Sequence, residues 1–99
     1  MTANDRRVSL YAANRLYVNA RLDADGRLHI EGQDLSRGEY EYMLSVKPDE
    51  IPLVVTALGG ADGDDVLDLL AANGTEIVHF GEMRWLKSLG VEPGFSSYR

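Results

Sequence analysis

The sequence predicts an α+β fold, in which an antiparallel β-meander of about four strands is followed by three helices on one face of the sheet, with a short C-terminal edge strand. Two observations support this fold class. Apolar side chains alternate with polar ones over residues 7–47, whereas they recur every three or four positions over residues 51–89. A sheet with one apolar face is usually antiparallel and is covered by helices on that face. The length of 99 residues predicts a single domain, 1–99.

The loop between the second and third strands can be derived from the register of the apolar side chains. Three strands are expected in the first part of the chain, over residues 7–12, 16–22 and 28–30. A two-residue turn would pair Leu22 with His29 and mix apolar and polar side chains on one face. A three-residue loop over residues 24–26 pairs Leu22 with Leu28 instead, and it places Gly26 where the backbone needs a positive φ. We therefore predict the three-residue loop.

Aromatic residues of the strands divide between the two faces of the predicted sheet. In residues 39–47, the clearest strand, Tyr40 and Tyr42 alternate with glutamates, so we expect both tyrosines on the core side. The alternation places Tyr11 and Tyr17 on the polar face of the first two strands. Exposed aromatic side chains favour a recognition surface, and ordinary cross-strand packing is the alternative interpretation.

The first predicted helix covers residues 51–58. Pro52 is tolerated only in the first turn of a helix, so Asp49 is the predicted N-cap, and Gly59-Gly60 ends the helix. A second helix is expected to start between residues 62 and 65, to end at Gly74 and to bury Val66, Leu69 and Leu70.

The third predicted helix runs from an N-cap at Thr75 to Leu89. Gly90 ends it, and Val91 can reach back to Leu86 as in a Schellman terminus. After Pro93, residues 95–98 are predicted as the short edge strand.

The composition excludes several classes of function. The net charge of −6 leaves no basic surplus for binding nucleic acid. No cysteine is present, so disulfides, thiolate nucleophiles and cysteine-bound zinc are excluded. A polar N-terminus and short apolar runs predict neither a signal peptide nor a membrane span, so we expect a cytoplasmic protein.

The acidic residues concentrate in the middle of the chain. Residues 34–68 hold nine acids and only two bases, which suits a basic partner, although solubility is the plainer interpretation. The densest group comprises Asp62, Asp64, Asp65 and Asp68. Negative charge at a helix N-terminus is stabilising by ~0.3–1 kcal/mol per group, which explains some of these acids and leaves a binding role open for the others.

No arrangement of residues predicts catalysis or metal binding. His29 and His79 are not at the spacing of a zinc pair, and neither has a partner that spacing identifies as an orienting group. Asp23 and Asp25 lack the third acid and the glutamate of a calcium loop. We therefore expect no catalytic residue, no metal and no cofactor, and a protein that is not an enzyme.

Several stretches carry a resemblance to a known kind of protein. They are YAANRL at 11–16, GQDL at 32–35, EYEY at 39–42, ALGG at 57–60 and WLKSLGVEPGFSS at 85–97. The chain resembles a family of small acidic actinobacterial proteins, some of which are similar to immunity proteins against contact-dependent or polymorphic toxins. The resemblance implies a protein that neutralises a cognate toxin domain, a nuclease or an NAD-degrading enzyme, by occluding it.

The acidic middle supplies the predicted partner-binding residues. A toxin domain with a basic cleft would meet an acidic surface, and complementary charge raises the association rate. The predicted contacts are Glu39, Glu41, Asp62, Asp64, Asp65 and Asp68, with Tyr17 as an aromatic anchor. The alternative is a non-catalytic protein-binding or regulatory module unrelated to toxins. An enzyme with a pocket lined by His29 or His79 is the third hypothesis.

Overall fold

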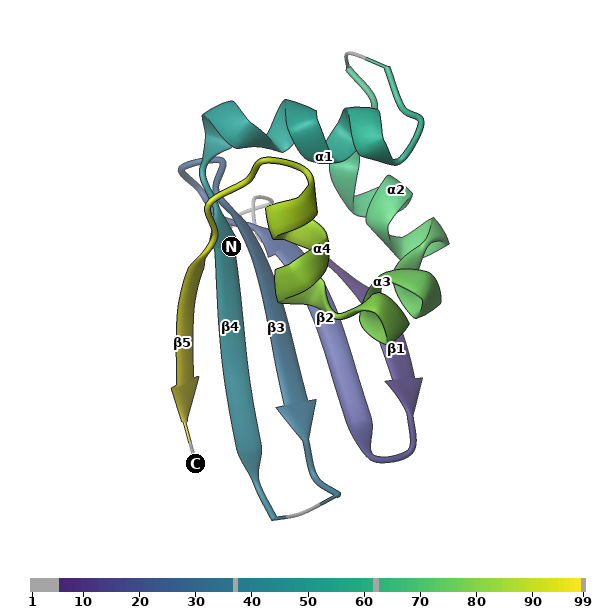
Figure 1. Ribbon diagram of the computed structural model, residues 1–99, viewed down its shortest axis with the longest axis vertical. Helices are drawn as coiled ribbons and strands as arrows, with labels where there is room; N and C mark the ends of the chain where they lie inside the picture. Colours follow the sequence, from purple (N-terminus) through teal and green to yellow (C-terminus); the bar gives the residue numbers. More distant parts are fainter. Residues whose placement is uncertain (1–5, 37, 62, 99) are drawn as a thin grey trace.

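The predicted α+β fold with a C-terminal strand is confirmed (Figure 1). The structure, a computed structural model, describes residues 6–36, 38–61 and 63–98. Five antiparallel strands form one sheet in the order β1-β2-β3-β4-β5, and the helices lie on one of its faces. The elements are β1 Arg7–Ala13, β2 Leu16–Leu22, β3 Leu28–Asp34, β4 Tyr40–Val46, the 3-10 helix η1 Pro48–Glu50, α1 Ile51–Ala57, α2 Val66–Ala72, α3 Gly74–Phe80, α4 Glu82–Ser88 and β5 Gly94–Tyr98.

The hairpin between β2 and β3 has the predicted three-residue loop. Leu22 pairs with Leu28, and the backbone N–H of Asp23 donates to the carbonyl of Arg27 at 3.0 Å. Gly26 takes the expected positive φ, at 82°. The apolar side chains of both strands consequently face the helices.

The core lies between the sheet and the helices. Alternate residues of β2, β3 and β4 are fully buried against residues of all four α-helices. The largest buried side chains are Leu28, Ile30, Leu44, Leu67, Leu70, Leu86, Val18, Val46 and Val54. Full burial of such a side chain contributes roughly 1.5–3 kcal/mol, so this layer accounts for most of the drive to fold.

A β-bulge in β1 makes one expectation wrong. Ser9 pairs with Asn19, but Tyr11 pairs with Val18, so Leu10 is an extra residue in the strand. The extra residue moves Tyr11 from the polar face to the helix-bearing face. There its ring meets the ring of His79 edge-on, with centroids 5.7 Å apart.

The first helix begins differently from the prediction. Pro48 opens the 3-10 turn η1, so Asp49 already lies within a helical turn and is not the N-cap. The residue that precedes α1 is Glu50, whose side chain makes no capping hydrogen bond. The helix ends as expected at Gly59-Gly60, where the N–H of Gly60 donates to the carbonyl of Val55.

The predicted third helix is two helices, and its predicted N-cap at Thr75 is wrong. Gly74 does not end α2 but begins α3, because Asn73 stands at the N-cap position. Gly81 then separates α3 from α4. Its backbone φ is 102°, a conformation that residues other than glycine rarely adopt. The Schellman end at Gly90 is confirmed, since the N–H of Val91 donates to the carbonyl of Leu86 at 3.2 Å.

The face of α2 that enters the core also differs by one position from the prediction. Leu67 is buried with Val66 and Leu70, whereas Leu69 is only half-buried.

Over the part of the chain that the structure describes, no helix has the length and apolar character needed to cross a membrane.

Candidate functional site

The outer face of the sheet lies opposite the helices, and no described helix covers it (Figure 1). Its side chains come from the residues that alternate with the core positions. The guanidinium groups of Arg7 and Arg21 bind the carboxylate of Glu31, at 3.5 and 2.8 Å. The arginines of the first two strands are therefore partly neutralised on this face.

A shallow hollow of about 360 Å³ lies on this outer face and brings together two of the predicted contact residues. Tyr17, Gln33 and Glu41 stand side by side on β2, β3 and β4. The side-chain amide of Gln33 donates to the carboxylate of Glu41 at 3.4 Å, and Tyr17 remains 43% exposed. Glu39 is exposed immediately before β4, at the same end of the strands. The hollow thus combines the ring of Tyr17 with the carboxylate of Glu41 and with Glu31, whose charge is paired with Arg7.

The acids at the start of α2 are engaged within the chain. Asp65 is the N-cap of α2 and accepts from the N–H of Leu67 at 2.9 Å. Arg6 donates to the carboxylates of both Asp65 and Asp68. Asp64 accepts from the backbone N–H of Ala61 at 2.8 Å, and Asp62 lies outside the described residues. Asp65 and Asp68 therefore tie Arg6 to the start of α2, and Asp64 is bound to the backbone of Ala61.

The two groups of predicted contact residues lie at opposite ends of the sheet. Glu41 is near the start of β4, whereas the start of α2 shares a hollow with Leu22 and Asp23 at the end of β2. Because β2 and β4 run in the same direction on either side of β3, the end of β2 lies at the same end of the sheet as the end of β4 (Figure 1). The structure therefore does not bring the predicted residues together into one acidic surface.

Tyr40 and Tyr42 lie on the helix-bearing face, as expected, and Tyr42 contacts a residue that sequence reasoning missed. The hydroxyl of Tyr42 donates to the carboxylate of Glu82, which is only 8% exposed. Burial first, and this hydrogen bond second, raise the pKa of Tyr42 well above its ordinary value. Glu82 follows Gly81 at the start of α4, and an acid after a helix break is a usual sign of a helix N-terminus.

The structure gives His29 a partner that its spacing did not identify. Its Nε2 lies 2.8 Å from the carboxylate of Asp23. This hydrogen bond, followed by that from the N–H of Arg27, lowers the pKa of Asp23 to about 2. The other ring nitrogen, Nδ1, is buried without a hydrogen-bond partner, although Ser45 lies opposite in the register. The pair therefore holds the hairpin together, and no hydrogen bond extends it to the serine.

No metal centre is formed by the residues that the structure describes: they contain no cluster of three or more histidine, aspartate or glutamate side chains that could hold an ion.

Comparisons of the chain with protein-family models, with curated proteins and with solved structures give no match.

Proposed function

We propose that this protein is an immunity protein, which binds a cognate toxin domain and neutralises it by occluding its substrate site. The resemblance of the sequence supports the biological role. The observation that carries the mode of action is the hollow on the uncovered sheet face, where Tyr17, Gln33 and Glu41 lie together.

The chemistry of this hollow fits a basic partner. Aromatic side chains in the centre of an interface supply much of the binding energy, because they bury a large rigid area. Glu41 lines this hollow together with Tyr17, and Glu39 is exposed immediately before β4. Exposed carboxylates cost little to keep in water before the partner arrives, and they attract a basic cleft over a distance. The outer sheet face would then occupy the basic cleft of the toxin and present the same negative charge as the toxin's own substrate.

We assign the contact with the partner mainly to the outer face of the sheet rather than to the start of α2. A partner's basic group would have to compete with Arg6 for Asp65 and Asp68, since both carboxylates already bind that guanidinium. Glu39 and Glu41 have no such ion pair within the described chain, so their charge is available to a partner. The toxin is a cytoplasmic nuclease or NAD-degrading domain in this proposal, and the protein acts in the same compartment.

Co-expression tests the proposal. The chain is produced in cells together with the toxin domain encoded beside its gene, and survival and co-purification are measured. Survival with a stable complex is the expected result, and Tyr17→Ala should reduce both while Thr75→Ala, an exposed change on α3, should not. A complex without protection would favour the regulatory binding module instead. Death of the cells with no complex would overturn both.

A further inference from the structure

A further hollow lies among the helices, on the side of the molecule opposite the outer sheet face. Its volume is about 310 Å³, at the small end of the ~300–1,000 Å³ range of ligand pockets. It lies between the end of α1 and the helices α3 and α4, with the buried Ile77 among its lining. The residues that give it chemical character are Asn73, Glu76, Phe80 and Trp85.

The polar groups of this hollow are hydrogen-bond acceptors. Glu76 is exposed on α3 and forms no ion pair with any described residue. The side-chain amide nitrogen of Asn73 donates to the carbonyl of Leu69 at 2.9 Å, which leaves its oxygen free to accept. The lining also includes Ala57 and Leu58 at the end of α1, where a helix carries partial negative charge. No basic side chain is part of the lining.

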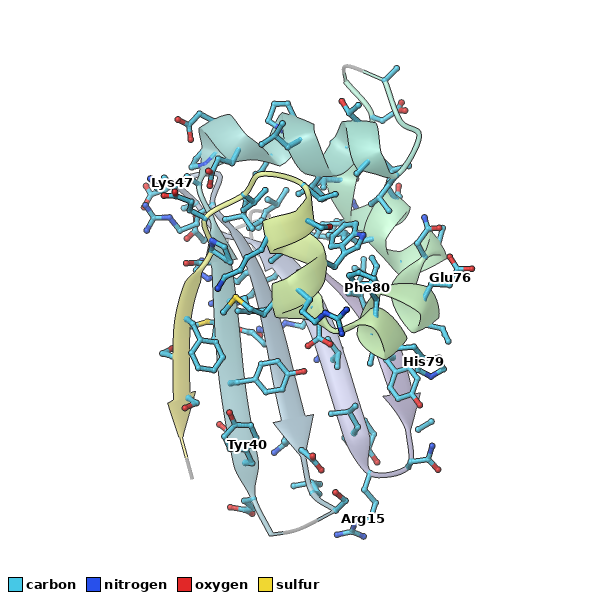
Figure 2. The ribbon with its side chains drawn as sticks, in the orientation of Figure 1. Arg15, Tyr40, Lys47, Glu76, His79 and Phe80 are labelled. Atoms are coloured by element: carbon cyan, nitrogen blue, oxygen red, sulfur yellow. The ribbon has the colours of Figure 1, made fainter. Side chains whose placement is uncertain are left out.

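Two aromatic rings complete the hollow, and one of them already binds a guanidinium. Phe80 is 46% exposed, and Figure 2 shows it with Glu76 on α3. The guanidinium carbon of Arg84 lies 5.0 Å from the centre of the Phe80 ring. Arg84 itself does not line the hollow, so the ring is shared between an internal cation and the space beside Trp85. Aromatic faces next to a carboxylate are a setting in which cations bind.

We infer that this hollow binds a guanidinium group, supplied by an arginine side chain of a second protein that docks on the helix side of the molecule. The planar cation would stack on Phe80 and Trp85 while its N–H groups donate to Glu76 and Asn73. Arginine fits better than lysine because its flat, weakly hydrated head can stack and donate at once. This inference is independent of the proposed function, because the hollow lies on the side of the molecule opposite the outer sheet face to which the toxin contact is assigned.

The protein contains a single tryptophan, so its fluorescence reports on this hollow directly. The isolated chain is titrated with N-acetyl-argininamide at constant ionic strength, and N-acetyl-citrullinamide serves as the neutral probe of the same shape. A saturable change in Trp85 emission with the arginine compound, and none with the citrulline compound, is expected. No saturable change with arginine, or an equal change with both compounds, would overturn the inference. No toxin enters this experiment, so its result is separate from that of the co-expression test.

Three variants test whether the arginine compound binds in this hollow. Glu76→Gln should weaken arginine binding about two- to fivefold, the effect of one exposed charge pair. Arg84→Gln should strengthen binding, because it frees the Phe80 ring from the internal cation. Lys87→Gln removes an equal charge from the same helix outside the hollow and is the matched control. Circular dichroism checks that each variant is folded. Equal affinity of Glu76→Gln and the wild type, or equal effects of the Arg84 and Lys87 changes, would contradict the assignment.

Discussion

The hydroxyl of Tyr42 is held against the buried carboxylate of Glu82, and this contact joins β4 to α4. Tyr42→Phe should lower the free energy of unfolding by about 1–3 kcal/mol, because a buried acceptor loses its donor. Tyr17→Phe is the control, since Tyr17 is exposed and a surface change of this kind is worth less than about 0.5 kcal/mol. Urea unfolding of both variants measures the difference.

The Tyr42 contact also predicts a dependence on alkaline pH. The pKa of Tyr42 is raised in the folded chain, so the folded protein keeps this proton where the unfolded chain releases it, above the ordinary value of 10.0. Stability from a raised pKa is complete below the unfolded value and is lost as the pH rises from that value through the folded one. The stability difference between the wild type and Tyr42→Phe should therefore narrow above pH 10.0. A constant difference would show that Tyr42 titrates normally.

The pair of Asp23 and His29 predicts the opposite behaviour in acid. The folded pKa of Asp23 is about 2, below its ordinary value of 3.8. The stability that this carboxylate contributes is present above 3.8 and is lost as the pH falls toward 2. His29→Gln should raise the pKa of Asp23 only part of the way back toward 3.8, since the N–H groups of Arg27 and Asp25 still donate to its carboxylate.

Carbon-detected NMR of the aspartate carboxyl groups measures this pKa directly. His79→Gln is the control, because His79 contacts Tyr11 and not Asp23. An Asp23 carboxyl that titrates near 3.8 in the wild type would contradict the described hydrogen bond.

The close approach of α3 to β1 depends on a single glycine. A Cβ atom on Gly74 would lie 2.1 Å from the carbonyl oxygen of Leu10, and that oxygen belongs to the backbone and cannot turn aside. Gly74→Ala should therefore destabilise the protein by about 1–3 kcal/mol, as overpacking of a core does. Thr75→Ala, on the exposed side of the same turn, should change stability by less than about 0.5 kcal/mol. Equal urea midpoints for both variants would show that α3 can move away from β1 without cost.

Elements whose signals are local could be predicted from the sequence. The register of β2 and β3 follows from their alternation and from the loop with Gly26, and the end of α4 follows from Gly90 and Val91. The bulge at Leu10 could not be found in this way. Val8, Leu10 and Ala12 alternate as in a regular strand, and only pairing with β2 shows that one residue is extra.

The division of the last helix and the ionic contacts depend on structure beyond local patterns. The apolar spacing continues across Gly81, so it does not reveal that the chain turns there. Arg6 and Asp65 are 59 positions apart, and no local pattern indicates that they meet. Of the predicted contact residues, Tyr17 and Glu41 could be placed on one face by alternation alone, whereas the separation of Asp64 and Asp65 from them required the path of the whole chain.

At the scale of the whole molecule, the negative charge is divided between two ends of the sheet. A strand of seven residues, such as β4, is about 20 Å long, which is roughly twice the screening length of ~10 Å at 0.1 M salt. Carboxylates at one end therefore act on an approaching partner almost independently of those at the other. For this reason, an experiment can distinguish the effect of net charge on association from the effect of local charge at the outer-face hollow.

Two double variants separate them. Glu39→Lys with Glu41→Lys reverses charge beside Tyr17, and Asp25→Lys with Asp49→Lys makes the same change in net charge at the opposite end, where both acids are exposed. Association with the toxin domain found by co-expression is measured by stopped flow at low and physiological salt. The first variant should associate at least about tenfold more slowly at low salt and lose most of its salt dependence, because steering charges act on the association rate. The second should stay close to the wild type. Equal slowing of both would mean that net charge alone steers the partner, and an unchanged rate for the first variant would place the contact away from Glu39, Glu41 and the outer-face hollow.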